Sequence, residues 1–342
     1  MRKVTLLFAV ISALSASAAQ PNDSVDGRYY RLFAPLTFYH NVADKTLALN
    51  SESAGKDNVS DAIDAALLKV YLKRPDLVQA TDGSWWMICL AYRTHGYLQH
   101  VMGRETFLAP VTWETGGWPV VNGDGTLQLD MQCKTLPQVP MPVEPAKDEF
   151  EADKLSLYWS HLNMPQKENY SLQARKGWLR LKTSTVTLDE VGNPTFIGHR
   201  QSEPNFTATT KVDVSGLKDG GVAGITAYAA HHNHYDVQVV VRDGKRYLQA
   251  KIRIGEMEHI EKEIPLTYNI VYLRITADPQ YYYLHYSTDG EHFTHLARMD
   301  YRYLSTETIG GFCGVHIGIF THTLTKTISY ADFDWTNFEF NQ

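Results

Sequence analysis

The chain has 342 residues, of which 44% are hydrophobic and 20% are charged, and its formal net charge is −6. This composition is typical of a globular protein with room for two ordinary domains. Acidic and basic residues are interspersed, which argues against a nucleic acid partner, and no apolar run beyond the amino terminus is long enough to cross a bilayer.

Residues 1–19 have the pattern of a secretory signal peptide. Arg2 and Lys3 precede an apolar stretch that reaches Leu14, and small residues follow up to Ala19. Such a segment is removed during export. No cysteine stands at the predicted cleavage site to carry a lipid anchor. We therefore expect a secreted or periplasmic protein.

Residues 20–75 are predicted to contain a strand followed by a helix. The strand-like pattern covers residues 29–39. Asn58 or Ser60 can cap a helix that ends before Pro75. Its apolar residues recur at steps of three and four, and they are Val59, Ile63, Ala66, Leu67, Val70 and Tyr71. The role of this segment is left open.

Residues 76–138 are predicted to form short strands. Residues 85–90 are a continuous apolar run that is typical of a buried strand, and the turn Asp82–Gly83 precedes them. Further glycine-rich turns lie at residues 116–117 and 122–125. A cluster of prolines then marks residues 139–147 as a stiff linker between domains.

Residues 148–342 are predicted to be almost entirely strands and turns. Apolar and polar residues alternate at 236–241, 247–252 and 281–286, and turn residues separate these segments. Many short strands at this spacing indicate an antiparallel sandwich of two sheets. The sequence therefore predicts a mainly β protein with a short α-helical segment near its amino terminus.

Several ordered motifs resemble the carboxy-terminal part of family 43 glycoside hydrolases, the β-xylosidases and α-L-arabinofuranosidases. The motifs are DLV at 76–78, GSWWM at 83–87, GRETFLAPVTW at 103–113, GWPV at 117–120, DEF at 148–150, NYSL at 169–172, GWLRL at 177–181, GFCG at 311–314 and ADFDW at 331–335. The resemblance implies a partial β-propeller blade at residues 76–138 and a concanavalin A-like β-sandwich at residues 148–342. It also implies a function in the breakdown of xylan or arabinan.

The sequence departs from this family in the residues that carry catalysis. The family uses two aspartates and a glutamate from earlier blades, and inverting hydrolysis needs two carboxyl groups about 6.5–9.5 Å apart. No DP motif or EGP motif precedes the blade, and Arg74 and Pro75 stand where the family has a histidine. We therefore expect no catalytic residue and no activity of this chain alone. Two alternatives remain, a hydrolase completed by a propeller from elsewhere and a secreted carbohydrate-binding or interaction module.

Two residues are candidates for binding a xylo- or arabino-oligosaccharide. The resemblance implies that Arg104 lines a sugar subsite, where its guanidinium group can bind hydroxyl or carboxylate oxygens. The alternative is a structural salt bridge with Glu105 or Glu114. Phe312 resembles the aromatic residue that the family's sandwich extends toward the active site. The alternative is a phenylalanine in the core or at a sheet edge.

The resemblance also implies a structural calcium ion. Asp148 and Asp334 fall in the first and last strands of the sandwich, which lie side by side in this family. Calcium binds about six to eight oxygens, so these carboxylates would need backbone carbonyls as further ligands. Glu149 could replace Asp148. The alternative is that both aspartates are solvated or hydrogen-bonded.

The histidines of residues 231–234 are not predicted to bind zinc. Neighbouring residues on a strand point to opposite faces, so His232 and His234 share a face, but no third ligand stands at a suitable spacing. We expect a hairpin turn at this segment.

Overall fold

The computed structural model describes residues 30–31, 68–69, 76–94, 99–113, 119–123, 125–129, 136 and 145–341, and of residues 30–31, 68–69 and 341 only the backbone. The chain divides into two compact units. Unit 1 comprises Met1–Leu98 and Arg104–Met141, and unit 2 comprises Gln99–Gly103 and Pro142–Gln342. No helix among the described residues is long and apolar enough to span a membrane.

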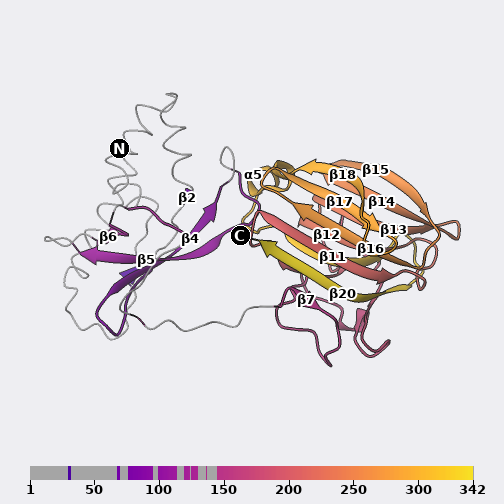
Figure 1. The fold of residues 1–342 in the computed structure, drawn as a ribbon, viewed down its shortest axis with the longest axis horizontal. Coiled ribbons are helices and arrows are strands. Elements are labelled where there is room, and N and C mark those ends of the chain that lie inside the picture. The colour runs from indigo at the N-terminus through magenta and orange to yellow at the C-terminus, as the bar shows by residue number, and fades with distance from the viewer. Residues whose placement is uncertain are drawn as a thin grey trace. The chain divides into compact units, whose positions relative to one another are not determined.

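Unit 1 contains an antiparallel sheet in which consecutive strands are neighbours (Figure 1). The strands are β3 (Asp76–Gln79), β4 (Trp85–Arg93), β5 (Glu105–Trp113) and β6 (Pro119–Val121), with β1 (Tyr30–Arg31) beside β3 and β2 (Leu68–Lys69) beside β4. Gly83 turns the chain between β3 and β4 with a φ of 84°. Asp82 fixes this turn, since its Oδ1 accepts the Ser84 amide at 3.0 Å. The predicted strands and the first turn are therefore confirmed.

The sheet of unit 1 is buried on one face. Met87, Cys89 and Ala109 are at most 2% exposed and lie in its core. On the opposite face, Ile88 and Leu108 are register partners in β4 and β5 and are 39% and 49% exposed. The apolar run at 85–90 therefore forms a strand, as predicted, in which Trp85, Trp86, Met87 and Cys89 are buried and Ile88 is exposed.

The helix expected between Ser60 and Lys73 is wrong for the two residues of it that the structure describes. Leu68 and Lys69 form β2 and pair with Arg93 and Tyr92 of β4. β3 pairs only with the first four residues of β4, so the end of β4 can accept a further strand. The rest of this predicted helix lies outside the described residues.

Unit 2 is a sandwich of two antiparallel sheets. The first, called the β12 sheet here, has the order β10 (Thr195–Arg200), β19 (His316–Thr323), β12 (Gly221–Ala230), β13 (Asn233–Arg242), β14 (Lys245–Ile254) and β15 (Met257–Leu266). The second, called the β11 sheet, has the order β18 (Thr294–Asp300), β17 (Tyr281–Ser287), β16 (Ile270–Ala277), β11 (Asn205–Asp213), β20 (Tyr330–Asn341), β9 (Leu179–Lys182) and β8 (Tyr170–Ser171), with β7 (Lys147–Asp148) beside β20.

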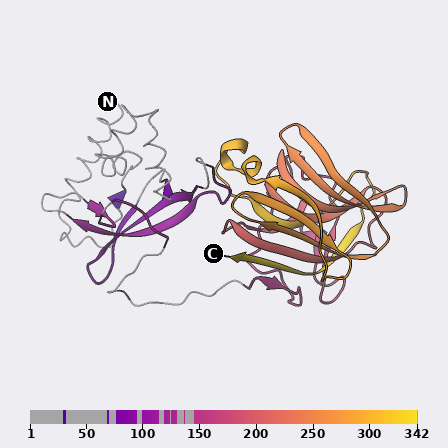
Figure 2. The ribbon, with the colours of Figure 1, turned by 45° about the horizontal axis from the view of Figure 1, so that its top comes forward.

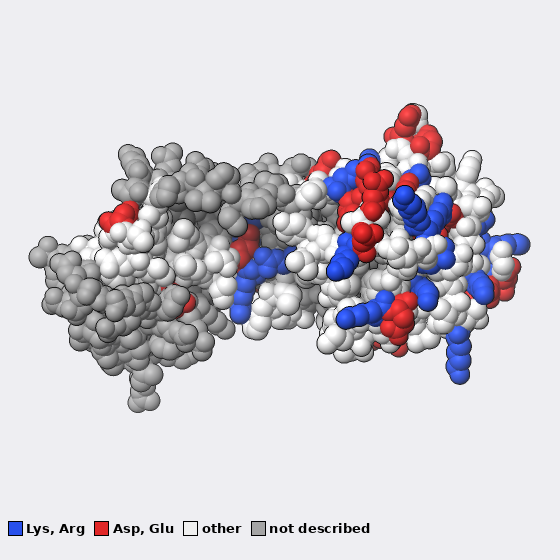
Figure 3. Space-filling model, turned by 90° about the horizontal axis from the view of Figure 1, so that it is seen from below, with Lys and Arg blue, Asp and Glu red and all other residues white. Residues whose placement is uncertain are grey.

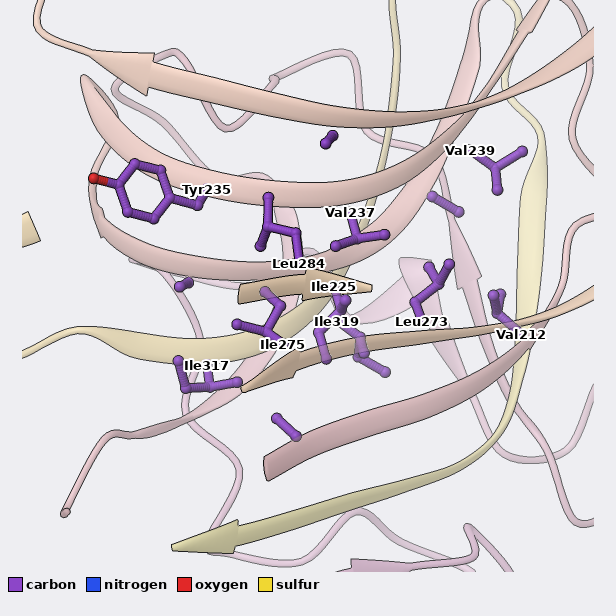
Figure 4. Close-up of a cluster of buried hydrophobic side chains, with 14 of the residues drawn as sticks. Val212, Ile225, Tyr235, Val237, Val239, Leu273, Ile275, Leu284, Ile317 and Ile319 are labelled. Carbon is purple, nitrogen blue, oxygen red and sulfur yellow. The ribbon is translucent and has the colours of Figure 1, made fainter. Parts of the chain in front are cut away.

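The core of unit 2 lies between the two sheets (Figure 4). Ile225 and Val237 from the β12 sheet and Leu273 and Leu284 from the β11 sheet point into it, and none of them is exposed. Burial of such a side chain contributes about 1.5–3 kcal/mol. The alternation seen in the sequence therefore places one set of side chains from each sheet in a shared core, as predicted.

The connections of unit 2 include short helical turns and tight hairpins. The turns η1 (Lys167–Asn169), η2 (Tyr301–Leu304) and α5 (Thr306–Ile309) interrupt the strands, and the last two lie at one end of the sandwich (Figure 2). His231 and His232 form the turn between β12 and β13, which confirms the predicted hairpin. On the face seen in Figure 3, basic and acidic side chains are interspersed over this unit.

The first and last strands of the sandwich are neighbours, as expected. Asp148 of β7 is the register partner of Thr336 in β20.

One contribution to unit 2 was not expected, because Gln99–Gly103, which lie between β4 and β5 in the chain, belong to this unit. Val101 and Met102 lie in its core, and the Val101 carbonyl accepts the Val315 amide at 2.7 Å.

Gly103 allows this segment to pass very close to the chain near Gly314. Its φ is 72°, and a side-chain carbon placed there would lie 2.3 Å from the Gly314 nitrogen. Only glycine tolerates both conditions. The glycine that opens the GRETFLAPVTW motif is therefore required by the packing of unit 2.

Candidate functional site

Arg104 lies directly before β5 in unit 1 and is partly buried. Its neighbour Glu105 is bound by Arg93, whose Nε and Nη2 donate to the two carboxylate oxygens at 3.0 and 2.9 Å. Such a two-pronged ion pair is strong and directional. Arg93 therefore neutralises Glu105, and Glu114 lies outside the described residues. The guanidinium group of Arg104 is of the type that binds hydroxyl and carboxylate oxygens.

Phe312 lies in unit 2, in the loop between α5 and β19. Gly310 and Gly311 precede it with φ angles of 73° and 95°, and its side chain is 59% exposed. The alternative of a core phenylalanine is therefore wrong. An exposed aromatic ring can cover the apolar face of a sugar. Arg104 belongs to unit 1 and Phe312 belongs to unit 2.

Asp148 stabilises the start of the sandwich through two hydrogen bonds. Its Oδ1 accepts the Phe150 amide and its Oδ2 accepts the indole Nε1 of Trp159, both at 2.8 Å. Phe150 has a φ of 53°, which is unusual for a residue with a side chain, and its ring is 2% exposed. The carboxylate thus compensates a strained turn and satisfies a buried indole.

Asp334 and Glu149 each bind a lysine. The Lys211 ammonium group lies 2.7 Å from Asp334, and both side chains are about a quarter exposed. Lys147 lies 2.5 Å from Glu149 near the surface. β20 bulges at Asp334, because Lys211 pairs with Trp335 and the next residue of β11 pairs with Phe333. The bulge and the ion pair hold Asp334 on the outer face of the β11 sheet.

The contacts of these acids do not fit a shared calcium ion. The Asp148 oxygens already accept two donors, and an ammonium group occupies the place of a cation at Asp334. Calcium would require about six to eight oxygens instead. Within the described ranges, no group of three or more His, Cys, Asp or Glu residues has a geometry that could hold a metal ion.

A buried ionic cluster on the outer face of the β12 sheet was missed by the sequence analysis. His234 is fully buried, with Nδ1 2.9 Å from Asp236 and Nε2 3.3 Å from Asp189. Lys251 places its ammonium group 2.6 Å from Asp189. Burial lowers the pKa of His234, but the two carboxylates outweigh burial and raise it to about 9. The alternation of residues 233–242 could have shown that His234 and Asp236 share a face.

The acidic residues described in unit 1 are Asp76, Asp82 and Glu105. Asp82 accepts hydrogen bonds from the amide and hydroxyl of Ser84 in a turn. Glu105 is held by Arg93. In the described part of this unit, these two carboxylates therefore have structural roles.

Residues 147–339 match the family described as "Beta xylosidase C-terminal Concanavalin A-like domain". The chain is 36% identical over 268 residues to the non-reducing end alpha-L-arabinofuranosidase BoGH43B of Bacteroides ovatus, covering 77% of this chain and 50% of that protein. It is 30% identical over 277 residues to a xylosidase/arabinosidase of Butyrivibrio fibrisolvens, covering 77% and 52%.

Among solved structures, the GH43 BlXynB protein of Bacillus licheniformis is similar with a TM-score of 0.73 and 26% identity, covering 79% of this chain and 54% of that one. The chain thus spans about half the length of the curated relatives described above. The resemblance inferred from the motifs is confirmed. The chain belongs to the family of β-xylosidase carboxy-terminal concanavalin A-like domains, whose relatives are glycoside hydrolases of family 43.

Proposed function

We propose that this chain is the carboxy-terminal module of a family 43 system for the breakdown of xylose- and arabinose-containing glycans, and that it does not hydrolyse glycosidic bonds by itself. The relatives named above are an arabinofuranosidase and a xylosidase/arabinosidase, and the family match over residues 147–339 includes nearly all of the sandwich. The amino-terminal pattern of Arg2, Lys3 and the following apolar residues supports export of the protein.

The state of Glu105 is the observation that supports an inactive chain most directly. A glycosidase needs one carboxyl group that can donate a proton and a second carboxylate that acts as base or nucleophile. Glu105 stands next to the proposed sugar ligand Arg104, but both of its oxygens accept hydrogen bonds from Arg93. Both carboxylate oxygens of Glu105 are therefore engaged in a structural ion pair with Arg93, so this residue does not supply one of the two carboxyl groups that catalysis needs.

Purified full-length chain should be incubated with 4-nitrophenyl β-D-xyloside and 4-nitrophenyl α-L-arabinofuranoside. We expect the same background rate from the wild type and from Arg104→Ala. A wild-type rate that disappears in Arg104→Ala would show catalysis and contradict the proposal. Mass spectrometry of the mature protein checks export, because a chain that keeps residues 1–19 would contradict it.

Arg104 and Phe312 are proposed to contact a xylo- or arabino-oligosaccharide. Titration with xylobiose should show weaker binding for Arg104→Ala and for Phe312→Ala than for the wild type. Lys218→Ala, on the exposed surface of the sandwich, serves as a control and should bind as the wild type does. Equal binding by all four proteins would leave these two residues without a role in sugar binding.

A second candidate is an active hydrolase completed by a propeller from elsewhere. It is favoured by the match over about half of each relative and by the retained segment 103–113. The reading frame directly upstream is the test. Blade motifs of the DP and EGP type in frame with this chain would support the candidate, and their absence there would count against it.

A further inference from the structure

The outer face of the β12 sheet carries a strip of buried polar side chains, called the polar strip here. Its members are at most 6% exposed and are Thr226, His234, Asp236, Gln238, Gln249 and Lys251. Thr226 is opposite Asp236, which is opposite Lys251, and Gln238 is opposite Gln249. Strand register therefore assembles the polar strip from β12, β13 and β14, on the side away from the core.

Several side chains of this face have buried hydrogen-bonding atoms that make no hydrogen bond within the described part of the chain. Among these atoms are Thr226 Oγ1, Gln238 Oε1 and His322 Nδ1. Leaving such an atom unsatisfied costs about 1–3 kcal/mol, so folded proteins rarely do it. Their positions on the neighbouring strands β12, β13 and β19 point to a ligand that carries several hydroxyl groups.

The charges of the polar strip favour a neutral ligand. Asp236 and Asp189 balance His234 and Lys251 at short distances. An anionic or cationic ligand would disturb this balance in a buried place, which is costly.

Aromatic rings border the polar strip. Tyr228 stacks on His234 with ring centroids 5.8 Å apart, and Phe320 stacks on His322 at 5.5 Å. Hydrogen-bonding groups beside apolar rings match the two kinds of surface that a sugar presents.

Residues 185–193, called the lid here, connect β9 to β10 and reach the polar strip. Leu188 packs with Phe196 and Phe320 on this face and is 1% exposed. Asp189 contacts Lys251 and His234, whereas Val191 is 82% exposed. The Thr187 amide and hydroxyl both donate to Glu190, so the lid has its own internal turn. The contacts of Asp189 with Lys251 and His234, called the latch here, thus hold the lid against the sheet.

We propose that the polar strip is a binding site for a neutral sugar unit and that the lid, latched by Asp189, opens to admit it. The sugar hydroxyls satisfy Thr226, Gln238 and His322. The proposed site uses neither Arg104 nor Phe312 and does not depend on hydrolysis. Because only the open state binds the sugar, the apparent affinity is the intrinsic affinity multiplied by the fraction of molecules in the open state. Weakening the latch raises this fraction and therefore raises the apparent affinity.

Isotope-labelled full-length protein should be titrated with D-xylose and L-arabinose while amide chemical shifts are recorded. We expect saturable shifts on β12, β13 and β14. Thr226→Val should abolish them without lowering the melting temperature, because the lost hydroxyl has no partner in the described structure. Asp189→Asn should bind these sugars about three- to tenfold more tightly than the wild type does, because its lid is closed in a smaller fraction of the molecules.

Thr207→Val on β11, in the other sheet, is the matched control and should bind as the wild type does. The proposal is overturned if neither the wild type nor Asp189→Asn shows saturable shifts, or if Thr226→Val binds unchanged. Binding that is lost in Arg104→Ala but kept in Thr226→Val belongs to the first proposed site and also overturns it. If Asp189→Asn does not fold, Thr226→Val and Thr207→Val decide the question.

Discussion

The carboxylate of Glu307 binds His100 twice, although the two residues are 207 positions apart in the chain. One oxygen accepts the His100 amide at 3.0 Å, and the other lies 2.6 Å from Nδ1 of the imidazole. Thr306 lies 2.9 Å from the second ring nitrogen. Burial raises the pKa of Glu307, but the hydrogen bonds from His100 outweigh it and lower this pKa. The segment Gln99–Gly103 is thereby anchored in the sandwich unit.

His100→Ala should lower the free energy of unfolding by about 2–4 kcal/mol, because it removes a buried partner of a charged group. Urea denaturation of the full-length chain measures this change. His292→Ala removes a similar contact with Asp289, but His292 is 86% exposed. We expect that control to lose at most about 1 kcal/mol. Equal losses in both variants would show that the anchor adds no stability.

Leu108→Lys should reduce binding of a hydrophobic dye without loss of stability. Leu108 and its partner Ile88 form an exposed apolar pair on the outer face of the sheet in unit 1. A substitution at such a position changes stability by about 0.5 kcal/mol or less. Met87→Lys, which places the charge in the core, should instead unfold unit 1. A large loss of stability in Leu108→Lys would mean that this face is covered in solution.

Asp148→Ala should destabilise the sandwich by about 2–3 kcal/mol, since the buried indole of Trp159 and the Phe150 amide lose their acceptor. Glu149→Ala breaks an exposed ion pair and should have little effect.

Melting temperatures of the protein in calcium and in a chelator should be equal, because Lys211 neutralises Asp334. If calcium raised the melting temperature and Asp334→Ala abolished this increase, the result would show that calcium binds at Asp334.

The free energy of unfolding should be greatest at about pH 6.5, which is the ordinary pKa of histidine. Burial lowers the pKa of His322 and of His199 to about 4. The unfolded chain therefore binds more protons than the folded chain as the pH falls from 6.5 to 4, and stability is lost in that window. His234 has the opposite shift, so its contribution is lost as the pH rises from 6.5 through about 9.

Urea denaturation at several pH values between 4 and 9 checks this profile. His322→Asn should flatten its acidic side, and Asp189→Asn should flatten its alkaline side, because one partner of the His234 imidazolium is lost. A free energy of unfolding that does not vary over this range would contradict the assigned shifts.

The sequence by itself predicted the sandwich and the family, and the family resemblance implied that the first and last strands of the sandwich are neighbours. Alternation along a strand is a local property, and hairpin turns such as Asp243–Gly244 depend on neighbouring residues. The motif at 103–113 was found for the same reason, since its residues are contiguous. The strand β2, Leu68–Lys69, was predicted to be part of a helix, because apolar spacing cannot show that the end of β4 is open to a further strand.

Only the tertiary structure decided which side chains meet. Arg93 binds Glu105 across 12 positions, Lys211 binds Asp334, and Asp189 binds Lys251 across 62 positions. Each pair depends on strand register and on the path of a loop, which residue spacing does not encode. The same is true of Gly103, whose place against Gly314 exists only because a segment between β4 and β5 joins the core of the other unit.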